Sequence, residues 1–198
     1  MGLIVKIDKK LNLVTNITRE DGSIVYLHVT PFPYEVVEEH CLLLGNLFTN
    51  FISQVGGLGA ARVAAMMLRK KLKREQDLSA EQGQQGPTIV DEIQRLTSVI
   101  WNDGGAWKTT SFDAAMKQGI ISPDEYREVE GEVVFFMVSS AIQKANLIAP
   151  TVGTVIKMYD GQLTSSSVTA FRDSLQTSKL DTDTQTQNAP PETSFIPS

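Results

Sequence analysis

The chain has 198 residues, 41% of them hydrophobic and 21% charged, with a formal net charge of −5. This length is enough for one folded domain with a hydrophobic core. The acidic balance argues against nonspecific nucleic-acid binding as the main activity. The most apolar run, residues 133–138, is far shorter than the roughly 20 residues of a membrane-spanning helix, so we expect no membrane association. The single cysteine, Cys41, excludes an intrachain disulfide, and its apolar neighbours predict a buried thiol.

The N-terminal part of the chain favours β-structure. Residues 3–7, 11–17 and 24–29 are rich in β-branched residues, and Asp21-Gly22 between the last two runs is a hairpin signal. Alternation in the third run places Tyr26 and His28 on one face of the strand. The sequence therefore predicts a small antiparallel β arm or hairpin over residues 1–30, ended by prolines 31 and 33.

From residue 34 the apolar residues follow helical spacing. Residues 31–162 are predicted to form a domain of about five helices, at about 34–55, 59–74, 88–101, 112–117 and 122–146. The Asn102-Asp103-Gly104-Gly105 segment is interpreted as the end of the third helix. Ser122-Pro123-Asp124-Glu125 predicts the start of the last one, with a capping serine and a proline at the first helical position. Residues 151–163 alternate in a way that favours a strand, but the segment is short and its assignment stays open.

A polar tail follows at residues 163–198, which contain fourteen serines or threonines. We predict that this tail is extended. Together with the predicted strands and helices, this gives a fold class that is mainly α (α+β), with a small N-terminal β element. Four apolar residues stand out in the tail and predict anchors of a segment that orders on binding: Phe171, Leu175, Phe195 and Ile196. The alternative is an unbound linker.

No catalytic pattern is visible. His28 and His40 are the only histidines, and Cys41 cannot face the adjacent His40 on a helix. Two histidines without further ligands do not form a zinc site. Gly56-Gly57-Leu58-Gly59 lacks the Lys-Ser/Thr of a phosphate loop. We therefore predict no catalytic, cofactor-binding or metal-binding residues and expect no enzyme; a small hydrolase or nucleotide-binding enzyme is the competing class.

Two features predict surfaces for a protein partner. The first is a cationic helix end formed by Arg69, Lys70, Lys71, Lys73 and Arg74. These cations either stabilise the helix dipole, dock an acidic partner or contact nucleic acid, in that order of preference. The second is Phe135 and Phe136, which point about 100° apart on a helix and form either core or a partner groove.

Several segments together resemble a known family: residues 24–31, 57–68, 91–97 and 128–136, followed by the Ser/Thr-rich tail. They resemble the tail assembly chaperones of long-tailed bacteriophages, and the resemblance spans about residues 24–178. It implies a non-enzymatic protein without cofactors that binds the tape-measure protein and helps tail-tube subunits polymerise. It further implies the host cytoplasm as the location during assembly.

A structural component of the virion, in the tail or the head–tail connector and held by neighbouring subunits, is the alternative that the same segments leave open. In either case we expect a homo-oligomer.

Overall fold

The computed structural model describes residues 10–55, 59–79 and 88–184. These residues form an α+β fold, whose elements in chain order are β1 (Asn12–Thr18), β2 (Ile24–Val29), α1 (Tyr34–Glu39), α2 (Cys41–Val55), α3 (Ala60–Ser79), α4 (Ile89–Arg95), β3 (Thr97–Asp103), β4 (Ala106–Ser111), α5 (Phe112–Lys117), α6 (Pro123–Ile142), α7 (Ala145–Lys157), β5 (Gln162–Thr164) and α8 (Val168–Thr184). The β segment expected at residues 3–7 lies outside the described residues.

The five strands form one antiparallel sheet in the order β4-β3-β2-β1-β5. The predicted β1–β2 hairpin is confirmed, with Gly22 in its turn at a φ of 80°. Its two strands lie inside the sheet, because β3 pairs with β2 and β5 pairs with β1. The N-terminal strands therefore belong to a sheet that residues 97–164 complete, rather than to a separate small arm.

The third helix was predicted to reach residue 101, and this is wrong. Helix α4 ends at Arg95, and the β-branched and aromatic residues that follow form β3. Gly104 and Gly105, at φ of 62° and 98°, make the two-residue turn that pairs Asp103 with Ala106. Two successive residues with positive φ match the right-handed twist of a hairpin. The glycines therefore connect two strands instead of ending a helix.

The other predicted helices have different outcomes. The first is divided at His40 into α1 and α2, and the second extends to Ser79 as α3. The short helix α5 is confirmed, as is the capping box of α6. Ser122 Oγ accepts the N–H of Glu125 at 3.2 Å, and the Ser122 N–H donates to Glu125 at 2.6 Å. The last helix ends four residues before Asn146, because α6 gives way to α7.

The structure settles the open assignment of residues 151–163 and corrects the predicted extended tail. Residues 151–163 mostly continue α7, where Val152, Val155 and Ile156 are buried at helical spacing; only β5 is a strand. The alternation of apolar residues in this segment was therefore no sign of a strand. The start of the tail forms α8 instead of an extended segment.

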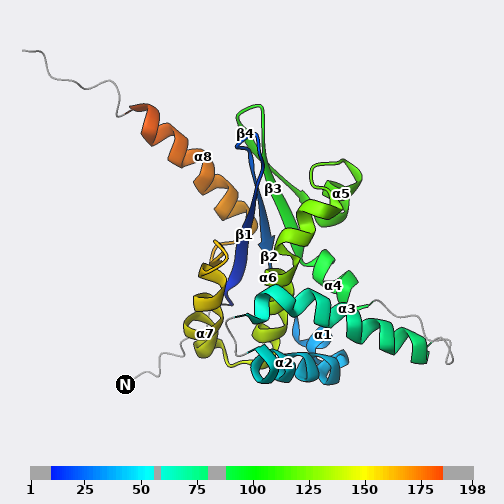
Figure 1. Cartoon of the computed structure of the whole chain (residues 1–198). Coiled ribbons are helices and arrows are strands. Elements are labelled where there is room, and N and C mark those ends of the chain that lie inside the picture. Colours follow the sequence, from blue (N-terminus) through cyan, green and yellow to red (C-terminus); the bar gives the residue numbers. More distant parts are fainter. Residues whose placement is uncertain (1–9, 56–58, 80–87, 185–198) are drawn as a thin grey trace, which may run out of the picture.

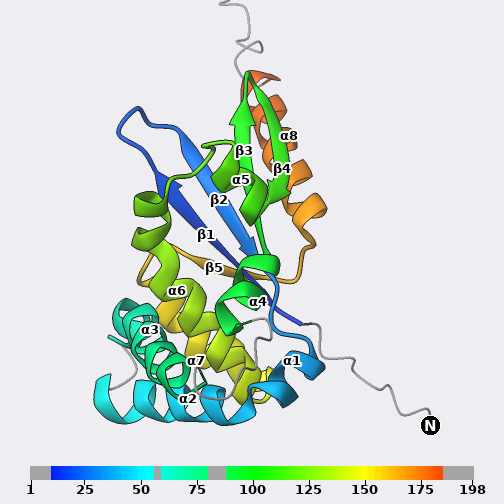
Figure 2. The ribbon, with the colours of Figure 1, turned by 90° about the vertical axis from the view of Figure 1, so that its right-hand side faces the viewer.

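The sheet lies between helices (Figure 1). Helices α5 and α6 cover one face of the sheet and α8 lies on the other, while α2 and α3 pack against α6, with α3 near Gly131 in its middle (Figures 1 and 2). The core continues from the sheet face under α6 into the contacts of α6 with α2 and α3. Thus α6 connects the sheet to the group of helices.

Candidate binding surfaces

The histidines and the cysteine that were considered for catalysis lie on different elements: His28 on β2, His40 at the end of α1 and Cys41 at the start of α2. His28 is buried on the sheet, where its Nε2 lies 3.0 Å from the carbonyl oxygen of Ser166, and burial lowers the pKa of its ring. Cys41 was predicted to be buried and is exposed. In the described part of the chain, no three histidines, cysteines or carboxylates are placed to hold a metal ion. No helix within residues 10–55, 59–79 and 88–184 is long and apolar enough to cross a membrane.

The cationic end of α3 is largely at the surface. Arg69, Lys70 and Lys73 are exposed, Lys71 is half-buried, and Arg74 belongs to the same helix. Arg69 forms an ion pair with Glu130 of α6. Part of the positive charge is therefore balanced within the chain, and the lysines are what this surface offers to an acidic partner.

Phe135 and Phe136 do not form a surface groove. Both are buried, and the ring centroid of Phe135 lies 5.9 Å from that of Phe51 on α2. Adjacent residues on α6 can both be buried because the sheet, α2 and α3 all contact this helix. Of the two roles left open for the pair, the structure shows the core.

Two of the predicted tail anchors hold α8 against the sheet. Phe171 contacts Tyr26 edge-on at a centroid distance of 5.5 Å and lies 6.5 Å from the ring of His28. Leu175 is half-buried one turn further on, and Gln176 donates to the carbonyl oxygen of Trp107 at 3.4 Å. These anchors attach the tail to its own domain. Phe195 and Ile196 lie outside the described residues.

Three large apolar residues of α1 and α2 are exposed, and together we call them the α1–α2 apolar face. Leu42 and Ile52 are 81% and 53% exposed, and Tyr34 at the start of α1 is 74% exposed. Gly45 and Thr49 lie between Leu42 and Ile52 on the same side of α2. None of the fifteen residues of α2 is charged. This absence of charge in the sequence could have indicated the apolar face.

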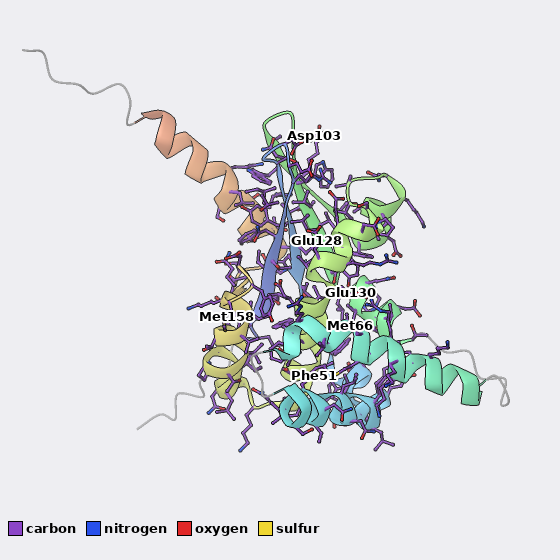
Figure 3. All side chains as sticks on the ribbon, viewed as in Figure 1. Phe51, Met66, Asp103, Glu128, Glu130 and Met158 are labelled. Atoms are coloured by element: carbon purple, nitrogen blue, oxygen red, sulfur yellow. The ribbon has the colours of Figure 1, made fainter. Side chains whose placement is uncertain are left out.

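A pocket of about 270 Å³ between α3 and α6 contains a buried carboxyl group. Glu132 is 6% exposed, and its Oε2 accepts a hydrogen bond of 2.8 Å from the hydroxyl of Thr15. Burial raises the pKa of Glu132 to about 7; the Thr15 hydrogen bond opposes this shift and Asp160 adds to it. Met66 of α3 and Glu128 of α6 line the same pocket and are labelled in Figure 3.

A second pocket of about 360 Å³ lies between the β1–β2 and β3–β4 hairpins, and we call it the hairpin notch. Its walls include both tryptophans of the chain, Trp101 and Trp107, together with Tyr26 and Asn102. Asp103, which follows Asn102, is labelled at the tip of the sheet in Figure 3. The sequence did not predict this site, because Trp101 was expected at the end of a helix.

No protein-family model, curated protein or solved structure matches the chain. The exposed surfaces and the resemblance of the sequence segments are therefore the observations that bear on its function.

Proposed function

We propose that the protein is a non-enzymatic tail assembly chaperone of a long-tailed bacteriophage, which binds tape-measure and tail-tube proteins. The observation that carries this proposal is the α1–α2 apolar face. Large apolar side chains that are exposed near one another mark interaction sites in soluble proteins, and here the exposed Thr49 lies between Leu42 and Ile52. Leu42 and Ile52 are mostly exposed. Helix α2 has no charged side chain that an apolar client would have to desolvate.

The shape of this face suits a helical client. Gly45 has no side chain and no other atom within 4 Å of the position that a Cβ would take, so the surface is open at this residue, between Leu42 and Thr49. A client helix can place a ridge of side chains at this open position, with Leu42 and Ile52 on its two sides. A tape-measure protein is long and apolar and offers such ridges repeatedly.

Co-purification tests the proposal. The phage tape-measure protein is co-expressed with the wild-type chain and with the Leu42→Lys/Ile52→Lys variant, and the captured client is quantified. We expect the variant to lose most of the client, since each lysine would be desolvated against an apolar helix. Client capture at the wild-type level would overturn the proposal for this face.

The matched control is the Leu147→Lys/Met158→Lys variant. It places the same two charges on two other exposed apolar residues, Leu147 of α7 and Met158, which caps the C-terminal end of α7 and is labelled in Figure 3. This variant is expected to retain the client. Thermal unfolding, monitored by circular dichroism, verifies that both variants are folded.

A permanent virion subunit could use the same face. Purified mature particles separate the two roles, because an assembly chaperone is absent from them. If the protein is present in the particles in stoichiometric amounts, it is a structural component of the tail or the connector and not an assembly chaperone.

A further inference from the structure

We propose that the hairpin notch is a docking site for the C-terminal segment of this same chain, residues 189–198. This proposal is independent of the proposed function.

The notch begins where two strands stop pairing. The ladder between β2 and β3 ends at the pair formed by Val25 and Trp101. Beyond this pair, Ile24 pairs with β1 and Asn102 pairs with β4. The two hairpins separate from there, as Figure 2 shows. The notch is therefore built into the strand register and does not depend on the rotamer of one side chain.

The walls of the notch combine aromatic rings with hydrogen-bond donors. The rings of Tyr26 and Trp107 contact each other at a centroid distance of 5.6 Å, and Trp101 lines the same pocket. Asn102 Oδ1 accepts the N–H of Gly105 at 2.9 Å, so its Nδ2 is the free end of the amide. Asn102 Nδ2 and Trp107 Nε1 have no acceptor among the described residues.

Buried donors without acceptors are unfavourable, because no hydrogen bond offsets the loss of their hydration. An occupant that brings carbonyl oxygens would satisfy them once the Asn102 amide and the Trp107 ring rotate toward the notch, because both nitrogen atoms are buried. Proline-rich segments are suited to this, because the polyproline II conformation leaves its carbonyls without internal partners. Such segments dock in grooves lined with aromatic side chains.

The end of this chain has that chemistry. Residues 189–198 read Ala-Pro-Pro-Glu-Thr-Ser-Phe-Ile-Pro-Ser, with three prolines and the apolar pair Phe195-Ile196. The prolines favour the extended conformation before binding, which lowers the entropy lost on docking. Phe195 supplies a ring for the aromatic wall.

The segment starts close enough to reach the notch. Helix α8 ends at Thr184, at the same end of the molecule as the β3–β4 turn in both views (Figures 1 and 2). Residues 185–198 follow, and they span up to about 46 Å when extended. A path from α8 to the notch therefore needs no change in the fold.

Tryptophan fluorescence of the full-length protein tests the proposal, because both tryptophans of the chain line the notch. The Pro190→Ser/Pro191→Ser/Phe195→Ala variant removes the proposed anchors. We expect its emission to shift to longer wavelength and to be quenched more strongly by acrylamide. The Thr193→Ala/Ser194→Ala variant, changed in the same segment, is expected to keep the wild-type spectrum. Identical emission and quenching of all three proteins would overturn the proposal.

Crosslinking then identifies the occupant. A photo-reactive residue at position 195 of the full-length protein should crosslink to Trp107 or another wall residue of the notch within the same chain. Mixing isotope-labelled with unlabelled protein distinguishes crosslinks within a chain from those between chains. Crosslinks only between chains, or only outside the notch, would contradict the proposal.

Discussion

The hydroxyl of Thr15 donates a hydrogen bond of 2.8 Å to Oε2 of Glu132 and thereby joins the sheet to the middle of α6. The contact is buried on both sides. A buried carboxyl group is unfavourable when ionised and is stabilised as the neutral form. The connection between sheet and helix therefore contains a group that titrates near neutral pH.

We expect Glu132 to make the protein less stable as the pH rises. The pKa of Glu132 is about 7 in the folded state and 4.5 in the unfolded chain, so between these pH values the folded chain holds a proton that the unfolded chain has released. The contribution of Glu132 to the free energy of unfolding therefore falls as the pH rises from 4.5 to 7 and is constant above pH 7. Glu132→Gln should raise the free energy of unfolding at pH 8 by on the order of 2 kcal/mol and have little effect at pH 4.5. Urea denaturation at both pH values measures the difference.

Glu128→Gln is the control for this change, since Glu128 lines the same pocket from α6 but is exposed. The free energy of unfolding of the Glu128→Gln variant should vary with pH as that of the wild type does. Equal pH dependence of the Glu132→Gln variant and the wild type would contradict the neutral buried carboxyl.

Glu125 at the start of α6 should have the opposite pH dependence. Arg19 donates a hydrogen bond of 2.6 Å to Glu125, and this bond lowers the pKa of the carboxyl. The ion pair then stabilises the fold above the unfolded pKa, and this contribution is lost as the pH falls through the folded value. Glu125→Gln is expected to lower the urea midpoint at pH 7 more than at pH 3. Asp124→Asn, which breaks the more exposed pair with Arg127, should change neither midpoint appreciably.

Two glycines should respond in opposite directions to the same substitution. A Cβ at Gly131 of α6 would lie 2.2 Å from the carbonyl oxygen of Ala61 on α3, whereas a Cβ at Gly45 of α2 would meet nothing within 4 Å. Gly131→Ala must push two helices apart and should destabilise the fold by about 2–4 kcal/mol. Gly45→Ala should stabilise it by about 0.5–1 kcal/mol through helix propensity. Chemical denaturation measures both, and equal effects would show that α3 and α6 are not in close contact.

Local signals predicted the elements whose causes are local. The hairpin at Gly22 and the capping box of Ser122 and Glu125 were found because a few adjacent residues specify them. The pocket at Glu132 and the hairpin notch were missed, since each depends on register between distant strands or helices. Trp101 shows the difference: its β-favouring neighbours and the following two glycines would have indicated a hairpin, but the apolar spacing before them continued a helix.

Helix α8 is expected to depend on one aromatic contact. Phe171 is the residue of α8 whose ring contacts Tyr26 and His28, and an edge-on aromatic pair contributes about 0.5–1.5 kcal/mol beyond its buried area. Phe171→Ala should therefore loosen α8 from the sheet and raise amide hydrogen exchange in its first two turns by about ten-fold, while exchange in α6 stays as in the wild type. Thr169→Ala, an exposed change on the same helix, should leave both rates unchanged. Exchange in α8 that is identical in the wild type and Phe171→Ala would show that other contacts hold this helix, with Leu175 and the Gln176 bond to Trp107 as the next residues to change.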